Sequence, residues 1–348
     1  MSMASADRIY QEEGARLCAV VDRFEDVPVL VLADLVLDEF LHAEIERVSR
    51  EAPVLIVQHR SLQAMPGGGA NAVNNVRALG GRPIPIGVVG RDDAGSRLVD
   101  LFRAAGIETD GIAVAEGYET PTKTRVLAAL PHSRPQQVVR IDRGAQRTVE
   151  AAVARAAVER AKALLDSAPA LLLSDYGYDL VRPDLAADLI RKARAENLKI
   201  TCDSRHRVRE FAGVTAVTPN LEEAEEILGW QLDDDGARLR EAGERLLKGL
   251  GAQDVLITRG SRGMLLFDAR DGPTEIPVFG SDQVADVTGA GDTVIAAFTL
   301  ALASGANALE AALVANAAAG LVVMKRGTAV VSARELNDAL RRAGRSRG

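Results

Sequence analysis

Strand-like segments that are mostly apolar recur along this chain, and stretches with helical spacing separate them. This alternation restricts the fold more than any other feature. The runs lie at residues 29–33 (VLVLA), 84–89 (IPIGVV), 171–173 (LLL) and 254–260 (DVLITRG). Strands of this kind are typical of parallel sheets that are covered on both faces. The chain shows no internal repeat and no low-complexity linker. We therefore expect an α/β fold, with a mainly parallel sheet and helices on both faces.

Composition narrows the range of partners. The 348 residues carry a net charge of −7, which argues against nucleic acid as the main partner but allows a local basic pocket for an anionic substrate. The two cysteines, Cys18 and Cys202, match neither a disulfide framework nor a zinc spacing, so we expect a reducing compartment. The polar N-terminus resembles no signal peptide, and no apolar run approaches the roughly 20 residues that span a bilayer. We expect a cytoplasmic protein without a membrane partner.

Residues 285–304 (ADVTGAGDTVIAAFTLALAS) combine a glycine-rich turn with a buried helix. Gly289, Ala290 and Gly291 leave the backbone accessible where the first N–H groups of the helix lack internal partners, which suits an anion. Asp292 follows directly, and a carboxylate beside an anion hole indicates proton abstraction next to developing negative charge. A plain helix N-cap explains the same residues equally well.

Two further polar segments follow apolar ones. In ADLVLDEF (33–40), Asp34 and Asp38 come after the first predicted strand, at the edge where α/β sheets bind ligands, although a solvated loop would also contain them. In MPGGGANAVNNVRALGG (65–81), Gly67 and Gly68 precede Asn71, which begins a helical pattern. A flexible turn before a helix is the alternative there.

Together, DVTGAGDT and PGGGAN resemble the PfkB (ribokinase-like) carbohydrate kinases, and the resemblance covers roughly residues 29–340. It implies that Asp292 is the catalytic base and that Gly289, Ala290 and Gly291 form the anion hole. It also implies one ribokinase-like kinase domain over residues 1–348, with no room for the nucleotidyltransferase domain that is fused to some heptose kinases.

The same resemblance implies a sugar site. ADLVLDEF is similar to the GDxxxD opening of these kinases, with Ala33 in place of glycine, and SDYG (174–177) also matches them. The segments TKTRV (122–126) and QVVRID (137–142) resemble heptose 7-phosphate kinases, in which cations would hold the existing phosphate of the substrate. The alternative is that the Lys and Arg side chains of these segments are solvated charges on the surface of the lid. The implied substrate-binding residues are Asp34, Asp38, Gly67, Gly68, Asn71, Lys123, Arg125, Arg140, Asp175 and Arg205.

Two departures from the heptose kinases fall close together. Tyr178 stands after SDYG, where those kinases continue with lysine. In DSRHR (203–207), Arg205 would replace the lysine of an Asp-Pro-Lys pattern. These departures keep a different substrate open.

The nucleotide side is also implied by resemblance. Its expected ATP-binding residues are Asn220, Thr258, Gly260, Gly263 and Asn316, although tight helix packing explains the surroundings of Asn316 equally well. Glu223 would organise Mg²⁺ through water, and Asp286 and Thr288 would form a monovalent-cation site, as in some relatives.

Segments at about 40–58 and 119–142 are expected to form a small β lid over the sugar, which often supplies a homodimer interface in the family. We expect residues 341–348 to be a disordered tail.

The resulting hypothesis is ATP-dependent phosphorylation of D-glycero-β-D-manno-heptose 7-phosphate at its anomeric hydroxyl. The alternatives are a kinase of another sugar, nucleoside or sugar phosphate, and a ligand-binding relative without catalysis. A dinucleotide-dependent oxidoreductase is less consistent with the sequence, because no GxGxxG motif follows the first predicted strand.

Overall fold

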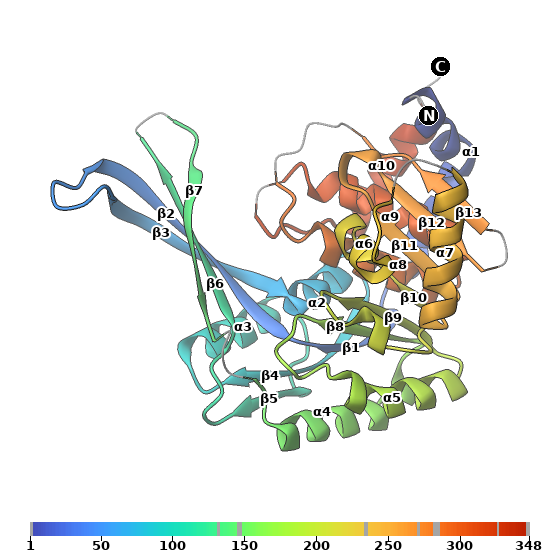
Figure 1. Cartoon of the computed structure of the whole chain (residues 1–348), viewed down its shortest axis with the longest axis horizontal. Helices are drawn as coiled ribbons and strands as arrows, with labels where there is room; N and C mark the ends of the chain where they lie inside the picture. Colours follow the sequence, from blue (N-terminus) through green and yellow to red (C-terminus); the bar gives the residue numbers. More distant parts are fainter. Residues whose placement is uncertain are drawn as a thin grey trace.

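A nine-stranded sheet forms the body of the protein in a computed structural model, which describes residues 3–130, 133–144, 148–232, 236–269, 272–280, 286–325 and 327–345 (Figure 1). In spatial order the strands are β13 (Gly272–Ile276), β12 (Met264–Asp268), β11 (Asp254–Thr258), β10 (Ala216–Val217), β9 (Lys199–Ser204), β8 (Ala170–Asp175), β1 (Pro28–Ala33), β4 (Arg82–Gly90) and β5 (Ile112–Ala115). All neighbours from β5 to β11 pair in parallel, and β12 and β13 add an antiparallel edge. The predicted fold class is confirmed.

Helices cover both faces of this sheet (Figure 1). One face carries α1 (Met3–Val21), α2 (Gly69–Ala78), α3 (Asp93–Ala104), α8 (Ala290–Ala303), α9 (Ala308–Val322) and α10 (Ala333–Arg345). The other carries α4 (Ala151–Ala163), α5 (Pro183–Ala195), α6 (Leu221–Leu228) and α7 (Gly236–Leu250). Short 3₁₀ turns lie at Asp22–Phe24, Leu165–Ser167, Val208–Glu210 and Gly260–Arg262.

The continuous apolar run in β1 serves both faces at once. Val29 and Val31 pack into the core under α8, whereas Leu30 and Leu32 pack into the core under α4 and α5. Successive side chains of a strand point to opposite faces, so a strand covered on both sides needs apolar residues at every position.

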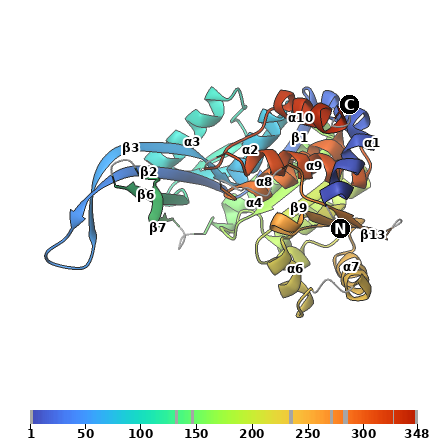
Figure 2. The same ribbon diagram turned by 90° about the horizontal axis from the view of Figure 1, so that it is seen from above.

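A second sheet of four strands, which we call the lid sheet, projects from the body (Figures 1 and 2). Its order is β3 (Leu55–Gly68), β2 (Leu35–Val48), β6 (Thr122–Ala129) and β7 (Gln136–Arg143). Strands β2 and β3 begin or end inside the body, so they are longer than the predicted segment at 40–58. Their pairing shifts register after His42 and after Ile45, irregularities of a kind that bends strands, and Figure 2 shows the pair curving away from the body.

The predicted disordered tail is wrong for residues 341–345, which continue α10. Leu336 and Leu340 bury the apolar side of this helix, and Gly344 lies against Gly14 of α1, where the lack of side chains permits close contact. Residues 346–348 lie outside the described ranges. None of the helices in the described part of the chain is both long enough and apolar enough to cross a membrane.

Candidate active site

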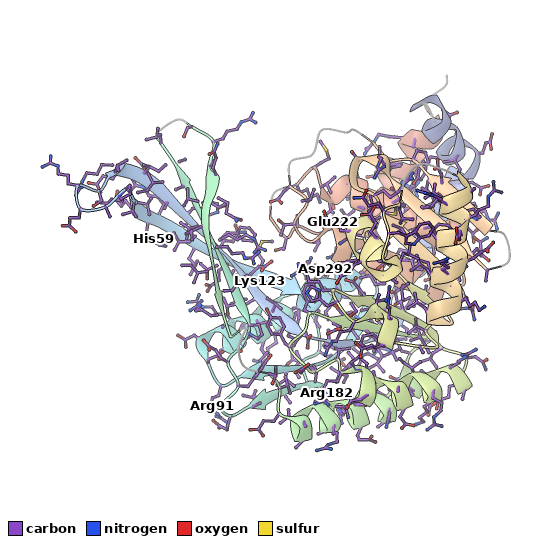
Figure 3. All side chains as sticks on the ribbon, viewed as in Figure 1. His59, Arg91, Lys123, Arg182, Glu222 and Asp292 are labelled. Atoms are coloured by element: carbon purple, nitrogen blue, oxygen red, sulfur yellow. The ribbon has the colours of Figure 1, made fainter. Side chains whose placement is uncertain are left out.

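Several of the predicted site residues lie at the carboxyl ends of the central strands. Strand β1 pairs with β4 on one side and β8 on the other, so the chain order reverses at β1. Ligands of open α/β sheets bind outside the carboxyl ends of strands at such a point. Asp34 follows β1 and Asp175 ends β8. Figure 3 shows Asp292 and Lys123 near one another where the lid sheet meets the body.

Asp34 is buried beneath the loop that follows β8. Its carboxylate accepts backbone N–H groups from Tyr176 (2.8 Å), Tyr178 (3.0 Å) and Leu180 (3.2 Å). Burial raises the pKa of Asp34 to about 6. Because its oxygens bind these three amides, Asp34 holds the loop in place, whereas the sequence suggested a direct role in substrate binding.

Asp38 and Arg125 meet between the lid strands β2 and β6. Arg125 Nη1 lies 2.9 Å from Asp38 Oδ1, and both side chains are largely buried. The same two atoms make no aligned hydrogen bond with any described residue. Buried polar atoms without hydrogen bonds are uncommon, so the pair can accept a polar ligand. Gly67 lies against it, and a Cβ there would sit 2.5 Å from Asp38 Cγ, so the site requires glycine.

Asp292 is 3% exposed and lies in the first turn of α8. Its Oδ1 accepts the Tyr176 hydroxyl at 2.7 Å, and its Oδ2 accepts Asn71 Nδ2 at 2.9 Å. Asn75 donates to Asn71 Oδ1 (3.1 Å), and the Thr293 hydroxyl donates to Asn75 Oδ1 (2.9 Å), so α2 and α8 fix the amide that orients Asp292. Burial raises the pKa of Asp292 to about 6. The carboxyl group can therefore exchange a proton near neutral pH.

The turn before Asp292 is open on one side. Gly289 has φ 78°, which favours glycine, and a Cβ there would lie 2.6 Å from Asn71 Nδ2. Ala290 begins the helix, and a Cβ added to Gly291 would meet no atom within 4 Å. Backbone N–H groups at a helix N-terminus beside free space can bind an anion.

Two cations converge on the ring of Tyr176. Lys123 Nζ lies 5.2 Å and Arg205 Cζ 5.5 Å from its centroid. Neither side chain makes an ion pair or a hydrogen bond with the residues that the structure describes, although Lys123 is only 8% exposed. Burial lowers the pKa of Lys123, and the charge of Arg205 lowers it further. A ligand anion between the two would offset their repulsion.

Two other predicted residues have protein partners instead. Arg140 is exposed on β7 and pairs through two nitrogens with Asp142 (2.9 and 3.0 Å). Asp175 accepts Arg207 Nη2 (2.6 Å) and the Ser204 hydroxyl (2.6 Å). Asp175 is thus part of an internal hydrogen-bond network. Unlike Lys123 and Arg205, its side chain already has protein partners among the described residues.

The predicted nucleotide residues follow strands β10 and β11. Asn220 and Glu223 form a capping box at the start of α6, with two bonds of 2.9 Å. Thr258 forms a bridge with Asn220, and Gly260 opens the next turn with φ 58°. Gly263 has φ 77°, and a Cβ there would lie 2.2 Å from the carbonyl oxygen of Ile276. These residues form one continuous edge.

Asn316 has contacts within the fold. Its Nδ2 donates to the Tyr10 hydroxyl and to the Pro277 carbonyl, each at 2.8 Å. It therefore ties α9 to α1 and to the segment after β13. Its proximity to adenine remains a prediction.

The donor set for Mg²⁺ is sparse. Within the described ranges, no three His, Cys, Asp or Glu side chains form a group that could hold a metal. Glu223 offers one carboxylate, and Asp203 lies within its electrostatic reach, since burial and then the charges of Asp292 and Glu223 raise the Asp203 pKa. One or two carboxylates together with substrate phosphates and water suit Mg²⁺, so these residues fit the ion.

Asp286 connects two loops. Its carboxylate accepts the backbone N–H groups of Thr288 (2.9 Å) and Gly327 (3.0 Å). These bonds account for its position, and a monovalent-cation site at Asp286 and Thr288 remains a prediction.

Tyr176 and Arg207 are the residues that sequence reasoning missed. Both lie within quoted motifs, SDYG and DSRHR, but no local pattern shows that a phenol would reach Asp292 or that an arginine would reach Asp175. Arg207 also contacts Asp179 at 3.0 Å.

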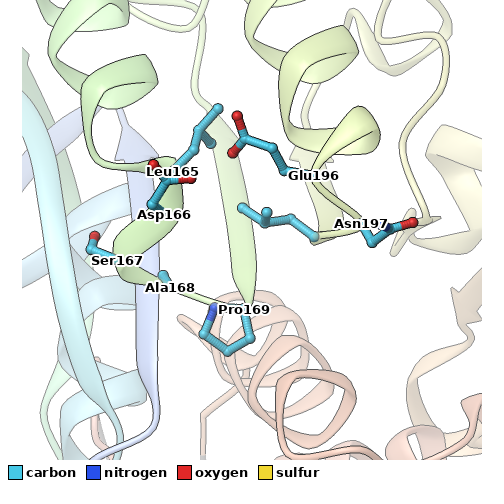
Figure 4. Close-up of a pocket in the computed structure, with 8 residues that line it drawn as sticks. Leu165, Asp166, Ser167, Ala168, Pro169, Glu196 and Asn197 are labelled. Carbon is cyan, nitrogen blue, oxygen red and sulfur yellow. The ribbon is translucent and has the colours of Figure 1, made fainter.

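The hollows in the surface differ in position. One of about 500 Å³ is lined by residues 165–169 and 196–198, at the amino ends of β8 and β9 (Figure 4). That is the opposite edge from the one where α/β sheets bind ligands. A smaller hollow of about 140 Å³ includes Arg205, His206 and Glu223, on the nucleotide side of the site.

Comparisons relate this chain to known proteins. The family model described as pfkB family carbohydrate kinase matches residues 35–334. A "Bifunctional protein HldE" of Mesorhizobium japonicum is 39% identical over 326 residues, which cover 93% of this chain and 64% of that protein. A protein of the same description from Desulfatibacillum aliphaticivorans is 37% identical over 321 residues, covering 92% and 64%. The chain thus spans less than two thirds of the length of these curated relatives.

Solved structures share the fold. Arabidopsis thaliana ribokinase complexed with ribose and ATP has a TM-score of 0.70 at 19% identity, over 90% of this chain and 99% of that one. Escherichia coli phosphofructokinase-2 in complex with fructose-6-phosphate has a TM-score of 0.71 at 18% identity, over 92% and 100%.

Asp292 should make stability depend on pH. Because its pKa rises from 3.8 to about 6 on folding, the folded state binds the proton more tightly. The free energy of unfolding should therefore fall as pH rises from about 4 to 6, by at most about 3 kcal/mol from this group. Asp292→Asn should flatten that dependence in urea titrations at several pH values. Asp34 contributes in the same direction and remains in the variant, so the slope should not vanish. The exposed Asp110→Asn is the matched control, and an equal flattening there would contradict the assignment.

Proposed function

The chain belongs to the pfkB family of carbohydrate kinases, and from that premise we propose that it transfers the γ-phosphoryl group of ATP to a hydroxyl of a sugar phosphate. The observation that carries the proposal is the pairing of a buried, doubly held carboxylate, Asp292, with an open helix N-terminus beside it. That pairing combines a proton acceptor with a cradle for negative charge.

In the proposed reaction, Asp292 accepts the proton of the acceptor hydroxyl as its oxygen attacks the γ-phosphorus. A new P–O bond forms, the bond to the β-phosphate oxygen breaks, and ADP leaves with that electron pair. The backbone of Gly289, Ala290 and Gly291 would stabilise charge on the phosphoryl oxygens. The protein contributes positioning and electrostatics, as phosphoryl transfer requires.

We further propose D-glycero-β-D-manno-heptose 7-phosphate as the acceptor, at its anomeric hydroxyl. Lys123 and Arg205 converge without anionic partners among the described residues, which supports an acceptor that already carries a phosphate. The similarity of TKTRV and QVVRID to heptose phosphate kinases, and the relatives named HldE, favour this sugar. Asp38, Arg125, Gly67, Gly68 and Asn71 would contact its hydroxyl groups.

ATP would lie along the edge formed by Asn220, Thr258, Gly260 and Gly263. Mg²⁺, held through Glu223 and the phosphates, supplies charge neutralisation on the transferred group when it is bound. The lid sheet would exclude water from the acceptor site.

A different acceptor is the second candidate. Tyr178, which stands where the heptose kinases have lysine, is nearly buried, so the cation at that position is lost. Another sugar, nucleoside or sugar phosphate would then be the substrate.

The test is ADP release by the purified protein with ATP and Mg²⁺. The acceptor panel is D-glycero-β-D-manno-heptose 7-phosphate, fructose phosphates, ribose and nucleosides. We expect selective turnover of the heptose phosphate. Selective turnover of another member of the panel would support the kinase assignment and contradict the proposed acceptor. ATP binding without turnover of any acceptor would favour a ligand-binding relative.

Asp292→Asn should remove the base at nearly unchanged size, and its amide oxygen can accept a hydrogen bond from only one of Asn71 and Tyr176. We expect kcat to fall by about 10²–10⁴-fold, the range for general-base catalysis, with ATP affinity nearly unchanged by calorimetry. Asp184→Asn on the surface of α5 is the control. Unchanged turnover in Asp292→Asn would eliminate Asp292 as the base.

We also propose a homodimer through the lid sheet. Strand β7 is an edge strand with every residue exposed, and Val138, Val139 and Ile141 are 41–50% exposed on it. An exposed apolar edge strand is a pairing surface, and a second copy of the chain would cover it.

Ile141→Lys should therefore produce a monomer in sedimentation velocity at a concentration where the wild type is a dimer. Val114→Lys, at a position that is 55% exposed on β5 of the body, is the matched control and should stay dimeric. A wild-type monomer at high micromolar concentration would exclude the proposal.

A further inference from the structure

We infer that Tyr176 is a positioning residue with two separable roles: its hydroxyl orients Asp292, and its ring holds Lys123 and Arg205 over the acceptor site. The hydroxyl lies 2.7 Å from Asp292 Oδ1, and the two cations lie 5.2 and 5.5 Å from the ring centroid. The catalytic consequences rest on the proposed kinase function. The hydrogen bond and the ring contacts do not depend on that function.

The hydroxyl acts as a fixed donor. Burial, and then the charge of Asp292, raise the pKa of Tyr176 well above its ordinary value, so the phenol keeps its proton and cannot serve as a base. With Tyr176 on Oδ1 and Asn71 on Oδ2, both oxygens of Asp292 are held from different elements. Rotation of the carboxylate is thereby restricted. Each oxygen keeps lone-pair capacity for an acceptor hydroxyl.

The loop that carries Tyr176 is itself fixed. Its backbone N–H donates to the buried carboxylate of Asp34 at 2.8 Å. The preceding residue, Asp175, is bound by Arg207 and by Ser204. Two buried carboxylates thus hold the loop from either side, and the phenol cannot leave Asp292 without breaking these contacts or changing its rotamer. This favours a permanent support over a temporary occupant of the acceptor position.

The ring joins the lid to the body. Lys123 lies on lid strand β6, whereas Arg205 follows β9 in the body. An aromatic face attracts cations, and more strongly where they are shielded from water. The Tyr176 ring therefore favours an arrangement that the like charges of Lys123 and Arg205 oppose. A substrate phosphate would find both cations already in position.

Several charged groups lie near Tyr176 and Asp292 and influence the pKa values of both. Asp38 on β2 and Asp203 on β9 raise the proton affinity of their neighbours, whereas Lys123 and Arg205 lower it. Tyr176→Phe keeps the ring and therefore leaves all four in place. Any shift in the titration of Asp292 then reports the lost hydroxyl.

Tyr176→Phe removes the hydroxyl and keeps the ring. Losing a donor to the ionised carboxylate raises the pKa of Asp292, so the acid limb of the kcat profile should move up by about 1 pH unit. We expect kcat at neutral pH to fall on the order of tenfold, from lost orientation, with KM for the sugar phosphate unchanged. Tyr118→Phe makes the same chemical change at another partly buried tyrosine and should leave the acid limb in place.

Tyr176→Leu removes the ring as well. We expect it to raise KM for the phosphorylated acceptor at least about fivefold beyond the Phe variant, because a contact of this kind contributes roughly 1 kcal/mol. Equal KM values in folded Phe and Leu variants would overturn the role of the ring. A rise in kcat or a fall in KM in Tyr176→Phe would show that the hydroxyl obstructs the acceptor.

A carboxyl ¹³C NMR titration of Asp292 separates this inference from the proposed function, since it needs no turnover. The Asp292 pKa should be higher in Tyr176→Phe than in the wild type and in Tyr118→Phe. An unchanged pKa would overturn the inference even in an active kinase. Absence of wild-type turnover on every acceptor would instead overturn the proposed function, while the titration still decides the hydrogen bond.

Discussion

The burial of the Asp292 carboxylate is the constraint on which the rest of the site depends. An ionised carboxylate out of water is costly unless it is hydrogen-bonded, and here two donors compensate. Asn71 reaches it from α2 and Tyr176 from the loop after β8. The N-terminus of α8 adds a favourable dipole. Because no single element supplies these contacts, the sheet, α2 and α8 must all be assembled before the carboxylate has its partners.

A second buried carboxylate, that of Asp34, fixes the loop after β8. Asp34 accepts hydrogen bonds from the backbone N–H groups of Tyr176, Tyr178 and Leu180, which are alternate residues of one loop. Ala33 precedes it where the resemblance expects glycine, and a Cβ on Gly69 would lie 2.7 Å from the Ala33 methyl. The third glycine of PGGGAN thus provides the space that the alanine occupies, and the backbone turn is kept.

The sequence was informative wherever a local pattern determines structure. Continuous apolar runs predicted the parallel sheet, and the glycine motifs predicted which segments would meet at its edge. Patterns of this kind do not show which long-range partner a polar side chain takes. Asn316 binds Tyr10, 306 positions away, and Tyr176 reaches Asp292 across 116 positions. The helical tail was missed for the same reason, since its stability comes from packing against α1 at the other end of the chain.

The two departures from the heptose kinases are physically one feature. Tyr178 and Asp179 follow SDYG, and DSRHR lies more than twenty residues further on, yet Arg207 binds both Asp175 and Asp179. The loop after β8 has Tyr178 where the resemblance leads us to expect lysine, and it is held by an arginine from the neighbouring strand end. Arg205, two residues earlier, turns a second cation toward Tyr176. A site that needs positive charge for a phosphate can therefore keep it while the residue that supplies it moves from one loop to the next. Tyr178 in place of lysine is therefore consistent with the proposed phosphorylated acceptor, because Arg205 supplies positive charge beside the same loop.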